Sequence, residues 1–217
     1  MADSARNARF YLYNNFPFTN VHQNVQKTVA RSYDAWNPPK PNTDAFGDMK
    51  LTVAMLQTFV ADAAANNVQL RAFGGQWSLS EAAIDDGWLI NTQPLNIVFK
   101  MAAGDVSPDY TNPPRNLVFA QCGNSVQEIN QFLEDNMLAL KTSGASDGQT
   151  ILGALTTGTH GSAIDFGAMQ DFVAGMHVIV SPTRHVWIER KSAPVVSQAF
   201  LNKLGAELVQ DDDTFNA

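Results

Sequence analysis

The spacing of hydrophobic residues predicts a helix followed by a strand in the first half of the chain. From Asp48 onward they recur at intervals of three and four, the period of an amphipathic helix that ends near Asn66 and Asn67. Residues 68–72 then form a predicted strand after a two-residue connection, and 87–91 and 97–99 are further short strand candidates. This order indicates an α/β unit. The helical positions are Met49, Val53, Leu56, Val60 and Ala63 or Ala64.

The second half repeats the alternation of strand and helix. A strand over residues 117–121 precedes Ser125 and Glu128, which have capping-box spacing at the start of a helix that ends near Asn136. Residues 172–180 alternate as a strand does, and 186–189 are predicted to pair antiparallel to them. A short helix around Phe200 is expected to end at Gly205, followed by a strand over 207–210.

Segments without a clean period divide the chain. Residues 1–47 are rich in Asn, Pro and Phe and are expected to form an extended arm laid over other structure. The three prolines within 104–116 mark a boundary, which gives a first lobe over 48–103 and a second over 104–217. Residues 211–214 are good helix-start residues with almost nothing after them, so we expect the chain to be truncated at its C-terminus.

Two glycine-containing stretches are candidates for binding phosphate groups. The first, residues 73–80, follows a predicted strand, and its bland interpretation is a tight turn. The second, residues 150–162, holds three glycines, four threonines, a serine and a histidine, which suits a loop that presents backbone amides rather than a helix. Gly153 and Gly158 have P-loop spacing, but Thr159 and His160 stand where that motif requires Lys and Ser or Thr, so nucleoside triphosphate hydrolysis is not expected.

Composition narrows the function classes. The 217 residues are 45% hydrophobic, which is ordinary for a globular protein with a core. A net charge of −7 does not favour nucleic-acid binding, and no stretch has the length of a membrane span. Cys122 is the only cysteine, so an intrachain disulfide is impossible and a reducing, cytoplasmic location is expected. No His, Asp or Glu spacing indicates a metal site, and we expect none.

Together the two stretches resemble the flavin-binding half of the vanillyl-alcohol oxidase and p-cresol methylhydroxylase (PCMH) family. Residues 71–78 resemble its first pyrophosphate loop, Arg-x-x-Gly-x-Gly-His-Ser, while 123–140 and 143–175 resemble the later helix, second loop and strand. Thr157 to Gly161 reads Thr-Gly-Thr-His-Gly, as in the sugar-lactone and alditol oxidase branch. The resemblance covers about residues 48–217 and implies an α+β fold, a PCMH-type FAD-binding domain of two α/β lobes, truncated before its substrate domain.

The resemblance implies FAD held between the lobes and a flavin that oxidises an alcohol or sugar-like small molecule by hydride transfer. The electron acceptor is open between O2, a quinone and a protein. Arg71 is expected to support the first loop rather than touch FAD. His160 is either beside the flavin, with a direct chemical role as the weaker option, or a loop histidine bonded to a carbonyl. The expected cofactor-binding residues are Phe73, Gly74, Gly75, Gln76, Trp77, Ser78, Thr150, Gly153, Thr157, Gly158, Thr159, His160, Gly161 and Ser162.

Two departures from the family pattern predict non-covalent FAD. Trp77 stands where many members carry the histidine that bonds covalently to the flavin. Ser146 and Asp147 occupy the region where some members carry a linking cysteine, and Cys122 lies well upstream. Trp77 either stacks near the ring system or fills the place of the histidine, and Asp147 is more naturally a turn cap than a ligand to a loop amide.

Other residues and other functions are weighed on the same grounds. Cys122 is expected to be a small buried hydrophobe and His177, within a predicted strand, a structural residue. One alternative function is a non-catalytic module that binds FAD or a nucleotide and retains the fold. Another is a protein that binds or transfers phosphate esters through the Gly153 loop alone. The oligomeric state is not predicted.

Overall fold

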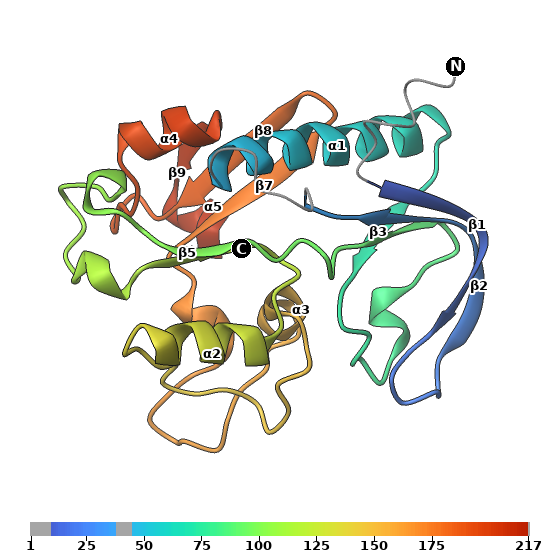
Figure 1. Ribbon diagram of the computed structural model, residues 1–217, viewed down its shortest axis with the longest axis horizontal. Helices are drawn as coiled ribbons and strands as arrows, with labels where there is room; N and C mark the ends of the chain where they lie inside the picture. Colours follow the sequence, from blue (N-terminus) through green and yellow to red (C-terminus); the bar gives the residue numbers. More distant parts are fainter. Residues whose placement is uncertain (1–9, 38–44, 217) are drawn as a thin grey trace.

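The computed structural model describes residues 10–37 and 45–216. Within these ranges the strands form three sheets, with strand orders β1-β2-β4-β3, β5-β6 and β7-β8-β9. Figure 1 shows the first and third sheets under one long helix, α1, with the smaller helices α2 and α3 below. Helices and sheets are mixed along the chain, as the predicted α+β class requires.

The N-terminal segment forms a β-hairpin, so the expected extended arm is wrong for residues 10–35. Strand β1 (Phe10–Thr19) pairs antiparallel with β2 (Gln26–Ala35), and β2 pairs parallel with β4 (Trp88–Asn91). Pro17 lies in β1 at the edge of the sheet, where a proline is tolerated because no neighbour on the open side needs its missing N–H. The prediction failed because Asn14, Asn15 and Pro17 interrupt the alternation of polar and apolar residues that would have indicated strand β1. Residues 45–47 of the predicted arm belong to helix α1, and residues 1–9 and 38–44 lie outside the described residues.

Helix α1 (Ala45–Ala65) begins earlier than predicted, and the predicted end is confirmed. Asn67 adopts a positive φ of 51°, and the amide of Val68 donates to the carbonyl of Ala63, which closes the helix end. One part of α1 packs Phe59 against the first sheet, whereas Met49 packs into a separate core beside the third sheet. The helix therefore joins the two sheets.

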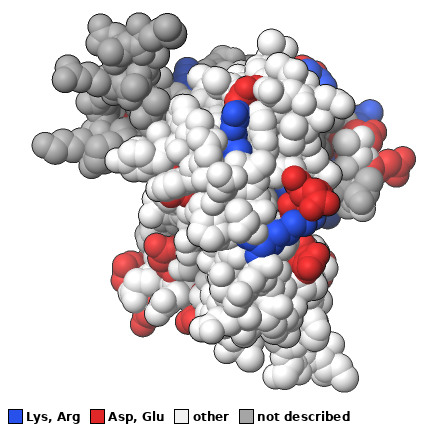
Figure 2. All heavy atoms as spheres, turned by 90° about the vertical axis from the view of Figure 1, so that its right-hand side faces the viewer, with Lys and Arg blue, Asp and Glu red and all other residues white. Residues whose placement is uncertain are grey.

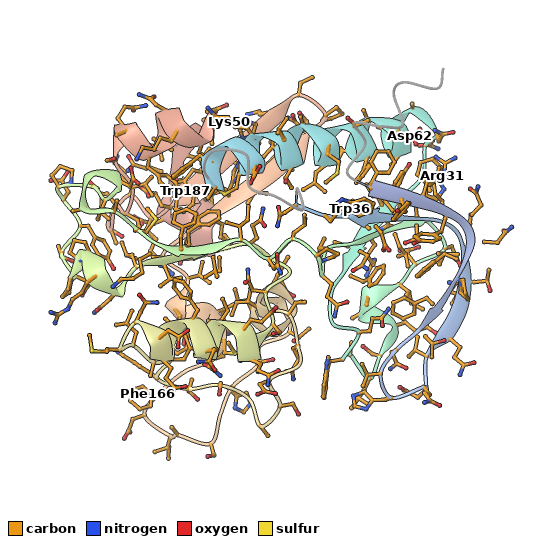
Figure 3. All side chains as sticks on the ribbon, in the orientation of Figure 1. Arg31, Trp36, Lys50, Asp62, Phe166 and Trp187 are labelled. Carbon is orange, nitrogen blue, oxygen red and sulfur yellow. The ribbon has the colours of Figure 1, made fainter. Side chains whose placement is uncertain are left out.

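Charged and aromatic side chains fix α1 to the hairpin. Arg31 on β2 donates to the Asp62 carboxylate at 2.7 Å, and its guanidinium lies 3.9 Å from the centre of the Trp88 ring. Figure 3 shows Arg31 and Asp62 side by side at the end of the helix, and Trp187 among the side chains between α1 and β5.

The short strands β3 to β6 match the prediction to within two residues at each end. Strand β3 (Leu70–Phe73) pairs parallel with β4, and β5 (Val98–Lys100) pairs antiparallel with β6 (Val118–Ala120). The division of the chain near residue 104 stays a prediction, although β5 and β6 pair across it. Short 3-10 helices occupy the connections: η2 (Glu81–Ala83), η3 (Ala103–Asp105) and η4 (Pro114–Asn116).

Two helices follow β6. Helix α2 (Val126–Asp135) has the predicted capping box: Ser125 Oγ accepts from the Glu128 amide, and the Glu128 carboxylate accepts from the Ser125 amide. The expectation that residues 150–162 form a loop without helix is wrong, because α3 (Ile151–Thr156) begins directly after Thr150. Thr150 Oγ1 accepts from the Gly153 amide, and Ala154 is fully buried against Val126 and Met169. Capping and packing override the low helix propensity of Gly and Thr.

The C-terminal sheet confirms most of the predicted pattern. Strand β7 (Gly175–Ser181) pairs antiparallel with β8 (Arg184–Glu189), and β9 (Glu207–Gln210) pairs parallel with β8. The strand predicted over 172–180 starts later, because η5 (Met169–Phe172) precedes it. Helix α4 (Gln198–Leu204) ends at Gly205, whose φ of 75° confirms the left-handed cap. A five-residue helix, α5 (Asp212–Asn216), follows β9.

Candidate cofactor-binding site

The two glycine stretches meet at their backbones. The first glycine loop (residues 73–78) leaves β3 and lies against residues 148–150, directly before α3. A Cβ on Gly75 would sit 2.7 Å from the carbonyl oxygen of Gly148 and 3.3 Å from the amide nitrogen of Thr150, and a Cβ on Gly74 would overlap the Thr150 side chain. Glycine at 74 and 75 is therefore what permits the contact.

The first glycine loop has backbone donors to offer a ligand. Among the described residues, the amides of 74–78 donate to no protein acceptor. Phe73, by contrast, is buried, and its carbonyl accepts from both the amide and the hydroxyl of Thr92. Strand β3 thus ends at a buried, hydrogen-bonded residue, and the amides that follow it are unpaired. Consecutive unpaired amides of this kind bind anionic oxygens.

A buried acceptor without a partner lies beside the same contact. Within the described chain, Gln149 Oε1 is buried and has no hydrogen-bond partner, although the backbone carbonyl of Gln149 accepts from the Val126 amide. Buried polar atoms are nearly always hydrogen-bonded, so an orphaned one in the segment that meets the first glycine loop fits a site that a polar ligand completes. These features fit a dinucleotide diphosphate, whose oxygens accept from amides and whose ring or sugar groups carry donors.

Trp77 lies between the two stretches. A Cβ on Gly148 would overlap the Trp77 indole, so the ring packs directly on the Gly148 backbone. On another side, the ring meets the His22 ring edge to face, with 5.8 Å between centroids. The indole is partly exposed.

The sequence reasoning missed Gly148 and Gln149. The signal available was the turn sequence Ser146 to Gly148, which indicates a bend and nothing about a ligand. The importance of Gly148 comes from the Trp77 ring, 71 positions earlier, and only the folded chain shows it. Asp147 is exposed, and its backbone carbonyl accepts from the Gln127 amide at 2.9 Å.

The rest of the second stretch folds back on its own lobe. Thr157 Oγ1 donates to the carbonyl of Gly153 at 2.8 Å, and the Thr159 amide donates to the carbonyl of Ala154. Gly158 has a φ of 67° and open space around its Cα, so it forms the turn that ends α3. Thr150 and Gly153 thus line the start of α3 and Thr157 to Thr159 its end. Whether all of them contact one cofactor stays a prediction.

His160 has the arrangement of a loop histidine bonded to a carbonyl. Its ring is exposed, and its Nδ1 lies 2.9 Å from the carbonyl oxygen of Gly161. The Gly161 amide in turn donates to Thr142 Oγ1 at 3.1 Å, and Ser162 is exposed. The proximity of His160 to a flavin stays a prediction.

Residues outside the loops have structural contacts. Arg71 donates to the carbonyl of Ala82 and forms an ion pair with Asp85, so it braces the segment that returns from the first glycine loop to β4. His177 and His185 are hydrogen-bonded across β7 and β8, with 2.9 Å between Nε2 and Nδ1. Burial, and then the neighbouring His185, lower the pKa of His177 to about 4.

Charge and metal ligands add little at this site. Figure 2 views the hairpin side of the molecule and shows basic groups near the middle of that face beside acidic ones. Lys27 of β2 forms an ion pair with Asp86. No group of three or more potential metal-ligating side chains is found in residues 10–37 and 45–216. Nor does any helix in those ranges have the length and apolar character needed to cross a membrane.

Comparison with known protein families shows which family the chain belongs to. A family described as "FAD binding domain" matches residues 51–188, well over half of the chain. The chain belongs to this FAD-binding domain family. The match includes the first glycine loop, Gly148 and Thr150, which are the residues that meet in the structure.

Curated relatives place this FAD-binding domain near the sugar-lactone branch of the PCMH-type flavoproteins, as the resemblance indicated. D-arabinono-1,4-lactone oxidase of Debaryomyces hansenii is 27% identical over 139 residues, which is 60% of this chain and 24% of that protein. L-gulono-1,4-lactone dehydrogenase of Mycobacterium tuberculosis is 26% identical over 128 residues, covering 59% of this chain and 28% of that protein. The chain spans about a quarter of the length of these relatives.

Solved structures of flavoenzymes share the fold. Cholesterol oxidase from Brevibacterium sterolicum superposes with a TM-score of 0.62 at 16% identity, over 84% of this chain and 33% of that one. Physcomitrella patens BBE-like 1 gives a TM-score of 0.57 at 14% identity, over 88% and 41% respectively. These likenesses confirm the predicted fold class.

Proposed function

We propose that the chain is the FAD-binding part of a flavin-dependent oxidoreductase that oxidises an alcohol or sugar-lactone-like substrate and holds its FAD non-covalently. The observation that carries the proposal is the meeting of Gly74 and Gly75 with Gly148 and Thr150, where five consecutive amides lack a protein acceptor among the described residues. The names of the relatives, lactone oxidases and lactone dehydrogenases, support the substrate class.

The chain's own residues have a binding and orienting role in this proposal. The amides of 74–78 would hold the pyrophosphate oxygens, and Thr150 and Gly153 would bound the opposite side. When bound, FAD supplies the hydride acceptor. The contact between the loops would hold the diphosphate in one place and so orient the two halves of the cofactor.

The chemistry of Trp77 supports non-covalent attachment. The indole nitrogen's lone pair belongs to the aromatic system, so the ring has no nucleophilic nitrogen like that of a histidine. The Trp77 ring also packs on Gly148, which leaves its indole N–H at the Gly148 backbone rather than free in the site. A flavin held only by amides and packing is released when the fold is lost.

A non-catalytic FAD- or nucleotide-binding module is the second candidate, favoured by the packing of Trp77 across the contact of the loops. Anaerobic mixing of the whole protein that contains this chain, loaded with FAD, with sugar lactones and simple alcohols separates the two. Bleaching of the oxidised flavin band by a substrate is the expected result. A protein that binds FAD and is reduced by dithionite but by no candidate substrate would favour the module. The cytoplasmic location expected from the single cysteine stays a prediction.

A further inference from the structure

The turn between β1 and β2 touches the first glycine loop, although it lies outside the residues matched by the FAD-binding family. We call residues 20–25 the hairpin turn. Figure 1 shows the lower end of the hairpin beside the loop that follows β3. Residues 20–25 and 76–79 are more than 50 positions apart, so the contact is a product of the sheet, in which β2 and β3 both pair with β4.

Three hydrogen bonds join the hairpin turn to the first glycine loop and to Leu79, which follows it. The Val21 amide donates to the carbonyl of Gln76 at 3.0 Å. Asn20 Nδ2 donates to the carbonyl of Ser78 at 2.9 Å, and Asn24 Nδ2 donates to the carbonyl of Leu79 at 2.7 Å. In each bond the hairpin turn is the donor and the loop backbone is the acceptor.

Asn20 also stabilises the hairpin turn itself. The residue is only 4% exposed. Its Oδ1 accepts from the Val25 amide, and its Nδ2 donates to Asn24 Oδ1. The Asn20 side chain therefore stabilises the hairpin turn and also binds the first glycine loop. Asn24 differs in being exposed, so a change there removes a loop contact with little effect on the core.

The bond from Val21 determines which way one amide of the loop faces, and the bonds from Asn20 and Asn24 fix the end of the loop. In a trans peptide the C=O and the N–H of the next residue point in opposite directions. When Val21 holds the carbonyl of Gln76, the amide of Trp77 must point away from the hairpin. Gln76 has a φ of 59°, a left-handed conformation that is unfavourable for a residue other than glycine and that the surrounding contacts hold in place.

We propose that the hairpin turn is a positioning element of the cofactor site: the Val21 amide orients the peptide between Gln76 and Trp77, and Asn20 and Asn24 hold the end of the first glycine loop through the carbonyls of Ser78 and Leu79, which keeps the loop's amides in place for the diphosphate. The two asparagines act through the loop. The proposal rests on the proposed function for its ligand, whereas the ordering of the loop is a property of the protein without any ligand.

The first test is FAD affinity, measured by flavin fluorescence titration of the wild-type protein, Asn20→Ala, Asn24→Ala and the control Asn14→Ala. Asn14 lies on the same hairpin, is exposed, and its side chain has no hydrogen-bond partner among the described residues. Loss of one loop bond is expected to weaken FAD binding about three- to tenfold, with Asn14→Ala unchanged. Dissociation constants for Asn20→Ala and Asn24→Ala within twofold of wild type would overturn the proposal.

The second test is hydrogen exchange of the backbone amides in the protein without FAD. Asn24→Ala, whose site is exposed, should fold even if Asn20→Ala does not. Faster exchange of the Val21 amide, which donates to the Gln76 carbonyl across the contact, with α1 and β7 unchanged, is the expected result; exchange at Val21 equal to wild type, or exchange raised throughout the chain, would overturn the proposal. If the wild-type protein binds no FAD, the proposed function fails, and the exchange result alone still decides whether the hairpin turn orders the loop.

Discussion

Replacing Gly75 by alanine tests the contact between the two glycine stretches. The new Cβ would lie 2.7 Å from the Gly148 carbonyl oxygen, about 0.7 Å short of the 3.4 Å at which ordinary contact begins, and 3.3 Å from the Thr150 nitrogen. Both neighbours are backbone atoms, which have no rotamer to change, so one stretch must move. Overpacking of this kind typically costs about 1–3 kcal/mol.

The assay is paired: thermal unfolding gives stability, and titration with FAD gives affinity. For a chain of this length each kcal/mol lowers Tm by about 2–4 °C, and parting the loops should also weaken FAD binding. Gly104→Ala is the matched control, because a Cβ there meets nothing within 4 Å and the residue has no positive φ. It is expected to change stability by less than about 0.5 kcal/mol and to leave FAD affinity unchanged.

The reasoning fails if Gly75→Ala behaves like Gly104→Ala in both measurements. That outcome would mean that the first glycine loop does not touch residues 148–150 in solution. A loss of stability in Gly75→Ala with full FAD affinity would also contradict the account, because it would separate the contact from the cofactor site.

Three further predictions concern other parts of the molecule. Glu189 is fully buried and accepts from Trp187 Nε1 and three other donors, so Glu189→Ala should lower the free energy of unfolding by about 3 kcal/mol in a urea titration, and unchanged stability would count against this network. The pKa of His177 is about 4 in the folded protein against a usual value near 6.5, so as the pH falls the unfolded chain takes up the proton first. The free energy of unfolding should therefore decrease by up to about 3 kcal/mol between pH 6.5 and pH 4. His177→Gln should flatten this decrease if His177, rather than His185, is its source. Burial raises the pKa of the Cys122 thiol, so a thiol reagent at pH 8 should label the unfolded protein quickly and the native protein slowly; equal rates would show that the thiol is accessible.

Local signals predicted those elements that are determined locally. The capping box of Ser125 and Glu128, the left-handed cap at Gly205 and the end of α1 near Asn67 depend on residues within one turn of each other, and the structure confirms all three. These residues cap the helices as the local sequence predicts because no distant residue in the described chain competes for their hydrogen bonds.

The hairpin and α3 depend on distant partners, which a single sequence does not reveal. Strand β2 is stabilised by pairing with β4, which lies more than 50 residues later in the chain. Pro17 argues against a strand in the sequence, yet β1 accommodates it because β1 is at the edge of the sheet. Helix α3 contains Gly153 and two β-branched residues, Ile151 and Thr156, yet the burial of Ala154 against Val126 fixes it as a helix.

Only part of the candidate site followed from the sequence. The pairing of the two glycine stretches came from the family resemblance, and the structure places Gly75 against Gly148 and Thr150. Spacing alone left the second stretch as a generic phosphate loop. Gly148 escaped notice because its role depends on the indole of Trp77, and the hairpin turn because its donors are ordinary asparagines.

The central claim is that the two glycine stretches hold FAD without a covalent bond. The most direct measurement adds FAD to the purified protein, removes the excess, denatures the protein with acid, and identifies the flavin in the supernatant and the pellet by mass spectrometry. The account predicts saturable uptake of FAD that is recovered entirely in the supernatant as intact FAD. Absence of uptake, or flavin retained on the precipitated chain, would contradict it.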